Sequence, residues 1–140
     1  MAETHAGIHD RIRERRAELI KLTKEIHADP ELGFEEQRAS HRQITLLEQW
    51  SFEVTAPFAG LDTAFKASYG RGSPVFCFMS EYDALKELGH GCGHNLIAGA
   101  ALAAGQALAR VLKDENVPGT VVVMGTPAEE TFGGKVKMVK

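Results

Sequence analysis

A strand–helix–strand pattern in the second half of the chain most narrows the folds open to it. Residues 75–79 are continuously apolar, residues 94–113 are rich in alanine and glycine with apolar side chains at helical spacing, and residues 120–124 form a second apolar, β-branched run. Two strands joined by such a helix form a parallel βαβ unit with a right-handed crossover. The pattern predicts an α/β sandwich in which the strand at 75–79 is central and covered on both faces.

The first half of the chain adds two helices and two strands. Apolar residues recur every three, four or seven positions over residues 8–27, and this helix is expected to end before Pro30, because a residue preceding proline disfavours the helical conformation. A second helix is expected over about 35–50. Segments rich in valine, phenylalanine and threonine at 52–55 and 62–69 are bounded by glycines, which is typical of strands.

Composition excludes several classes of protein. With 44% hydrophobic and 25% charged residues, the 140-residue chain resembles an average soluble domain, and its net charge of -3 offers no basic field for nucleic acid. The stretch 96–112 contains Gln106 and Arg110, so a membrane span is not expected. The first residues lack the apolar core of a signal peptide, and Cys77 and Cys92 are too few for a disulfide scaffold. We therefore expect a cytoplasmic protein with neither nucleic acid nor membrane as a partner.

Metal-ligating side chains follow the first strand of the βαβ unit. Cys92 and His94 flank one glycine where the helix begins, and ligands of α/β sheets bind at the carboxyl ends of the strands. A thiolate and an imidazole suit zinc, and the positive end of the helix dipole is expected to keep Cys92 ionised. Taken alone, the pair is equally compatible with a tight glycine turn in which both side chains only pack or cap the helix.

Glu129 and Glu130 follow the second strand and strengthen the metal interpretation. One carboxylate can ligate an ion while its neighbour acts as general base toward an activated water. Most adjacent glutamates form a solvated acidic turn, but the Cys92/His94 loop at the neighbouring strand end favours the metal site. Nucleotide sites are disfavoured, because the glycines at 70–72 lack the third glycine of a dinucleotide fingerprint and no complete P-loop motif occurs.

Four sequence motifs are spread over almost the whole chain. They are HADPELGFEE at 27–36, YDAL at 82–85, GHGCGHN at 89–95, and TPAEE at 126–130 followed by GGK at 133–135. Together they resemble the amidohydrolase branch of metallopeptidase family twenty, which includes aminoacylases, carboxypeptidase G-type enzymes, indoleacetyl-amino-acid hydrolases and cytosolic dipeptidases. The second and third motifs most resemble the aminoacylase-1-like dipeptidase subgroup.

The resemblance implies a dinuclear zinc or manganese amidohydrolase that cleaves an amide bond in a dipeptide or an N-acyl amino acid. By position, Cys92, His94 and Glu130 would ligate the metals. Glu129 would be the general base, and Asp83 would be a supporting residue near the metals. The implied fold is a three-layer α/β/α sandwich with a central, mostly parallel sheet, as in zinc exopeptidases.

The chain departs from the family pattern at two positions and in length. Glu81 stands where many relatives have a histidine ligand, which agrees with the cysteine-containing branch, and Lys86 replaces a common proline. The motif at 27–36 is interpreted as a turn between helices without chemistry. The family's domain continues well past residue 140 with further histidine ligands and a dimerising lid. Residues 1–140 are thus expected to be the N-terminal portion of a catalytic domain, inactive alone, whose full-length parent is a homodimer.

Two alternatives remain open. The chain could be a non-catalytic fragment that at most binds a metal or a partner chain through apolar sheet edges. It could instead hold one structural zinc through Cys92, His94 and His90, although Cys77, the other cysteine, lies in a strand expected to be buried. The sequence does not define the substrate, nor does it distinguish zinc from manganese, because mixed nitrogen, oxygen and sulfur ligands tolerate both ions.

Overall fold

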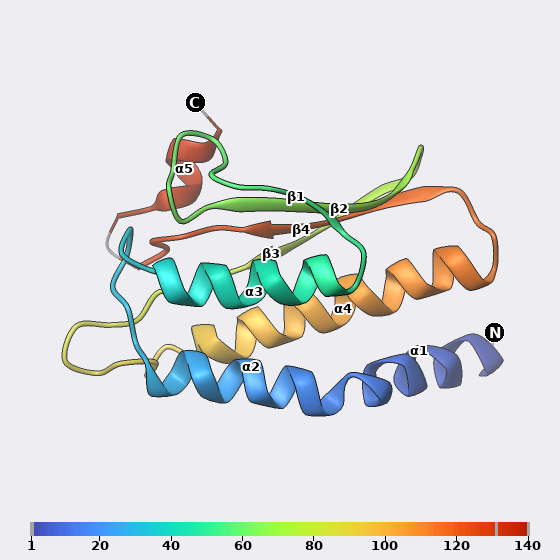
Figure 1. The fold of residues 1–140 in the computed structure, drawn as a ribbon, viewed down its shortest axis with the longest axis horizontal. Coiled ribbons are helices and arrows are strands. Elements are labelled where there is room, and N and C mark those ends of the chain that lie inside the picture. The colour runs from blue at the N-terminus through green and yellow to red at the C-terminus, as the bar shows by residue number, and fades with distance from the viewer. Residues whose placement is uncertain (1, 131, 140) are drawn as a thin grey trace.

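The protein folds into a four-stranded sheet with helices packed on it (Figure 1). The computed structural model describes the backbone of residues 2–130 and 132–139, and within these ranges the side chains from residue 7 onward. The elements, in chain order, are α1 (Ala2–Glu14), α2 (Arg16–Ala28), α3 (Gln37–Gln49), β1 (Glu53–Thr55), β2 (Phe65–Arg71), β3 (Val75–Ser80), α4 (His94–Asp114), β4 (Gly119–Gly125) and α5 (Gly134–Met138).

The sheet is mixed, with strand order β1-β2-β4-β3. β3 and β4 are parallel and α4 connects them, so the predicted βαβ unit is confirmed. β1 with β2 and β2 with β4 are antiparallel, and the prediction of a mostly parallel sheet is therefore wrong for the described strands. The reason lies in the short turn between β2 and β3. Because it leaves no room for a crossover helix, β3 runs opposite to β2, and β4, parallel to β3, is antiparallel to β2.

The four longer helices lie on one side of the sheet (Figure 1). α4 packs on β3 and β4, α3 packs mainly on β1 and β2, and α1 and α2 form an outer layer against α4. The order of layers in residues 2–130 and 132–139 is thus sheet, helix, helix, and the predicted α/β/α order is not observed there. What the sequence pattern predicts correctly is the mixed α/β class and the pairing of each apolar helix face with the sheet.

Glycines allow α4 to lie close to its neighbours. A Cβ atom on Gly105 would collide with Cγ2 of Val123, and one on Gly99 would collide with Cγ2 of Thr23 on α2. α4 is long and apolar enough to cross a membrane by length and composition, but more than half of its most apolar window is buried in the fold. Its position between the sheet and α2 is that of a core helix.

Two elements differ from the sequence prediction. The predicted helix over residues 8–27 is two helices separated at Arg15, although it ends before Pro30 as expected. β3 lies at an edge of the described sheet, and its side chains are exposed: Val75 62%, Phe76 46%, Met79 56%, with Cys77 also exposed. The prediction of a central strand covered on both faces is wrong here, because β4 pairs with only one of its edges.

Candidate metal centre

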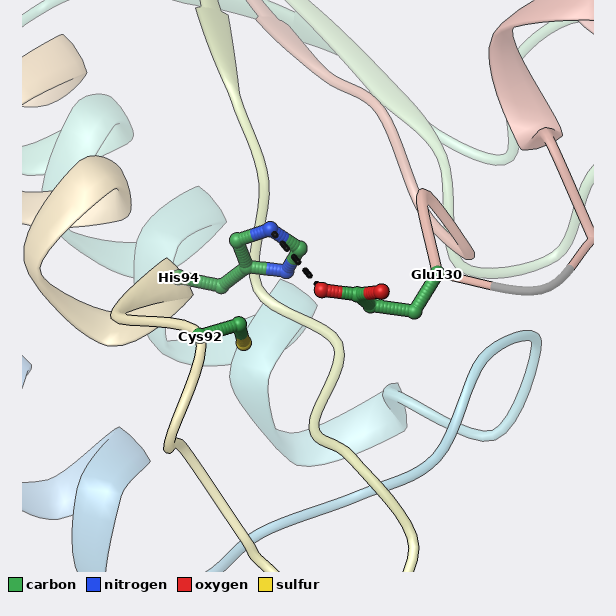
Figure 2. Close-up of side chains that lie close together, drawn as sticks. All are labelled: Cys92, His94 and Glu130. Carbon is green, nitrogen blue, oxygen red and sulfur yellow. Dashed lines mark ion pairs between the residues drawn. The ribbon is translucent and has the colours of Figure 1, made fainter.

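The loops that follow β3 and β4 bring three predicted ligands together. One ligand atom each from Cys92, His94 and Glu130 lies within 4.8 Å of the others (Figure 2). Gly93, with φ of 83°, caps α4 in the left-handed conformation that glycine adopts without strain, and His94 is the first residue of the helix. The tight turn thereby directs the side chains on both sides of Gly93 to one place.

Asp83 holds the His94 ring. Nδ1 of His94 lies 2.9 Å from Oδ1 of Asp83 and 3.1 Å from the Asp83 carbonyl oxygen, and both residues are buried. Because both partners accept hydrogen bonds, the neutral ring carries its proton on Nδ1 and keeps a lone pair on Nε2. This is the arrangement in which a carboxylate fixes the orientation and tautomer of a metal-binding histidine.

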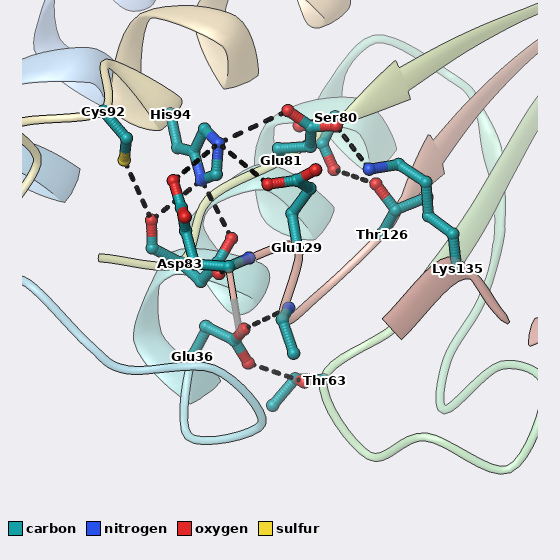
Figure 3. A network of polar contacts seen from close by, with 12 residues as sticks. Glu36, Thr63, Ser80, Glu81, Asp83, Cys92, His94, Thr126, Glu129 and Lys135 are labelled. Atoms are coloured by element: carbon teal, nitrogen blue, oxygen red, sulfur yellow. Dashed lines mark hydrogen bonds and ion pairs between the residues drawn. The ribbon is translucent and has the colours of Figure 1, made fainter. Parts of the chain in front are cut away.

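Three carboxylates surround Nε2 of His94 (Figure 3). The nearest oxygens belong to Glu81 at 3.5 Å, Glu129 at 3.8 Å and Glu130 at 3.9 Å. Lys135 forms an ion pair with Glu81. So many carboxylates around one ring leave an excess of negative charge that a divalent cation would offset. The donor atoms, a sulfur, an imidazole nitrogen and carboxylate oxygens, fit zinc and also tolerate manganese.

The Cys92 thiol does not have the predicted ionisation. Burial raises the pKa of Cys92, and the nearby Glu130 and Asp83 raise it further. Its Sγ lies 3.8 Å from the Asp83 carbonyl oxygen as a hydrogen-bond donor. The expectation that the helix dipole keeps the thiol ionised is therefore wrong for the metal-free chain, because desolvation outweighs the hydrogen bond from the His94 amide that lowers the pKa.

Comparisons with known proteins agree with this site. The family described as Peptidase family M20/M25/M40 matches residues 77–140, the part that holds both loops. The Xaa-Arg dipeptidase of Mus musculus is 39% identical over 94% of this chain, and a p-aminobenzoyl-glutamate hydrolase of Escherichia coli (strain K12) is 36% identical over 100% of it. The chain belongs to the peptidase M20 family. The resemblance inferred from the four motifs is confirmed.

The match to M20 proteins covers only part of them. The chain spans 33% of each of these two relatives, about a third of their length. A solved M20 structure, a Bacillus subtilis protein described as a dinuclear metal binding peptidase, superposes with a TM-score of 0.72 at 25% identity over 91% of this chain and 39% of its own. The fold of the described residues is therefore that of one part of an M20 peptidase.

The alternative of a closed structural zinc site is not what the structure forms. The cluster of close ligand atoms in the described part of the chain contains Glu130 and not His90. The His90 ring is buried and lies 6.4 Å from the ring of His27, centroid to centroid. Cys77, considered for the fourth ligand position, is exposed on β3.

Sequence reasoning missed two contributors to this M20 site. Lys135, in the GGK motif, pairs with Glu81, which sequence reasoning noted only as a departure from the family pattern. Glu36, in the motif at 27–36 to which no chemistry was assigned, is fully buried and accepts a hydrogen bond from the amide of Ala128 at 2.7 Å. Burial raises the pKa of Glu36. A buried acid that directly follows the exposed Glu35 gave no local signal.

Proposed function

We propose that residues 1–140 are the N-terminal portion of the catalytic domain of a metal-dependent M20 amidohydrolase that cleaves an amide bond in a dipeptide or an N-acyl amino acid. The observation that carries the proposal is the convergence of ligand atoms of Cys92, His94 and Glu130 within 4.8 Å, with Asp83 fixing the His94 ring. The relatives named above, a dipeptidase and an aminobenzoyl-glutamate hydrolase, support the class of substrate.

In this proposal Cys92, His94 and Glu130 hold a divalent ion, zinc or manganese. When bound, such an ion polarises an amide carbonyl and lowers the pKa of a water molecule. The description of the Bacillus subtilis relative as dinuclear supports a second ion in the complete site. Cys92 gives up its proton on binding, so that its thiolate balances part of the cationic charge.

Glu129 is the proposed general base. Its carboxylate lies beside the proposed ligand Glu130, with Oε2 3.8 Å from Nε2 of His94, and its side chain is 42% exposed and so accessible to water and substrate. From this place it can accept a proton from the attacking water and pass it to the leaving amine. Homodimerisation of the full-length parent and a cytoplasmic location belong to the same proposal and rest on the resemblance alone.

Hydrolysis of dipeptides and N-acyl amino acids by the full-length parent, loaded with zinc or manganese, tests this proposal. Glu129→Gln should lower kcat by about 100-fold or more and leave metal content unchanged, because general-base catalysis contributes at least that much. Glu115→Gln, exposed near the end of α4, is the matched control and should be as active as the parent. An unchanged rate in Glu129→Gln would exclude Glu129 as the base.

A second candidate is a non-catalytic chain that binds a metal ion or a partner chain. The exposed apolar side chains of β3 favour it, because an unpaired apolar edge promotes association. Isothermal titration with zinc, together with an activity assay on the 140-residue chain, separates the candidates. We expect zinc binding without turnover from this chain, and robust turnover would rule out the non-catalytic candidate.

A further inference from the structure

Two buried carboxylates hold the loop that carries Glu129, one on each side of it (Figure 3). The amide of Ala128 donates to Oε1 of Glu36 at 2.7 Å, and the amide of Glu130 donates to Oδ2 of Asp83 at 2.9 Å. Both acids are fully buried. The main chain before and after Glu129 is therefore anchored, whereas the Glu129 side chain itself stays partly exposed.

Ala128 has a conformation that needs such an anchor. Its φ is 53°, in the left-handed region that residues with a Cβ disfavour, and it is fully buried. Its carbonyl oxygen accepts the amide of Gly134 at 2.9 Å, and a Cβ atom on Gly134 would collide with the Pro127 carbonyl oxygen. The turn that aims Glu129 and Glu130 is thus a strained one, held at its start by the Glu36 carboxylate.

Glu36 is committed to this contact. Its second oxygen accepts the hydroxyl hydrogen bond of Thr63 at 2.9 Å, and among the described side chains it has no cationic partner. A carboxylate is costly to bury without a cation, so its hydrogen bonds to neighbouring groups decide where it can sit. The same segment touches the other loop, since the Glu31 carbonyl accepts the amide of Ala84, next to Asp83, at 2.8 Å.

We propose that Glu36 is a positioning residue of the metal centre. Through Ala128 it keeps the turn in its left-handed conformation and so directs the Glu129 and Glu130 carboxylates toward His94. This inference rests on the metal site of the proposed function. It gives the motif at 27–36 a role that the motif's place in the sequence did not indicate.

Cobalt binding by three variants tests the role. Co²⁺ held by the Cys92 thiolate gives a charge-transfer absorption that reports on occupancy of this site, independently of activity. Glu36→Ala should weaken Co²⁺ binding by about tenfold or more, the usual effect of losing a group that supports a metal ligand. Glu36→Gln, which keeps an oxygen acceptor for the Ala128 amide, should bind nearly as the parent does. Ala128→Gly in the Glu36→Ala background should restore much of the affinity, because glycine adopts a positive φ without strain.

Hydrogen exchange at the Glu130 amide provides a readout that needs no metal. This amide is bonded to Asp83 and not to Glu36, so faster exchange in Glu36→Ala, by about tenfold, would mean that the whole turn has loosened. Leu112→Ala, at the opposite end of the sheet, controls for general loss of stability and should change neither readout selectively.

The outcomes separate the two proposals. If the parent protein binds no Co²⁺ through Cys92, the proposed function fails, and exchange at the Glu130 amide still decides the role of Glu36. If the parent binds Co²⁺ but Glu36→Ala changes neither affinity nor exchange, the positioning role is wrong. The same holds if Ala128→Gly does not restore affinity in the Glu36→Ala background.

Discussion

The buried carboxylate of Asp83 contacts both loops of the candidate metal centre, because its Oδ1 accepts Nδ1–H of His94 at 2.9 Å and its Oδ2 accepts the amide of Glu130 at 2.9 Å. A single side chain therefore sets the orientation of one proposed ligand and the main-chain position of another. An amide in its place could accept only one of these hydrogen bonds.

Asp83→Asn should accordingly weaken zinc binding by about 10- to 100-fold, as loss of a carboxylate behind a metal-binding histidine does. It should also lower the free energy of unfolding by about 1–3 kcal/mol, because one buried donor loses its acceptor. Isothermal titration and urea denaturation measure the two effects. Asp62→Asn, at an exposed position, is the control, and equal zinc affinity in both variants would contradict the proposed role of Asp83.

Cys92→Ser should discriminate between metals. A serine hydroxyl is a harder and weaker ligand than a thiolate, so zinc affinity should fall by more than manganese affinity. Competition titrations with both ions measure the ratio. Cys77→Ser, on the exposed strand β3, should leave both affinities unchanged. Loss of the two affinities in equal proportion would argue that Cys92 supports the fold without ligating.

Glu36→Gln should change how stability depends on pH. Burial raises the pKa of Glu36 above its ordinary value of 4.5, so ionisation favours the unfolded chain. The stabilisation from this group is complete below the unfolded pKa and is lost as the pH rises through the folded pKa. Glutamine does not ionise, so the free energy of unfolding of Glu36→Gln relative to the parent should increase over that pH range. A constant difference in urea denaturation across the range would mean that the carboxylate titrates normally.

Gly105→Ala should destabilise the protein although alanine is the better helix former. The added methyl group would collide with Val123, and overpacking of a core costs about 1–3 kcal/mol, which exceeds the gain of about 1 kcal/mol in helix propensity. Thermal unfolding measures the sum. Ala100→Gly, at an exposed position on the same helix, calibrates the propensity effect. A higher melting temperature for Gly105→Ala would show that α4 can move away from the sheet.

Local features of the chain were sufficient to predict the βαβ unit, the helix end before Pro30 and the two loops of the site. Each depends on residues close in sequence, such as the apolar runs and the Cys-Gly-His turn. The contact of Glu36 with Ala128 joins positions 92 residues apart, so no local pattern encodes it. The apolar run of β3 records a tendency to be buried but does not specify which surface covers it.

The ionisation of Cys92 was mispredicted for a similar reason. The helix that begins beside it is local and visible in the sequence, whereas burial and the carboxylate of Glu130 come from the folded arrangement of two loops. The break between α1 and α2 at Arg15 has no proline or glycine to mark it. There the Arg15 guanidinium lies over the Trp50 ring, 5.8 Å from its centroid, a tertiary contact that helical spacing does not encode.

The placement of Cys92 at the start of α4 and of Glu130 beyond β4 has a consequence for folding. A cation that both residues grip would tie together two points of the chain with a whole helix and strand between them, and it would thereby restrict the unfolded ensemble as a covalent cross-link does. Chelation would then release that constraint, so the resistance of α4 and β4 to heat would depend on how much metal is supplied.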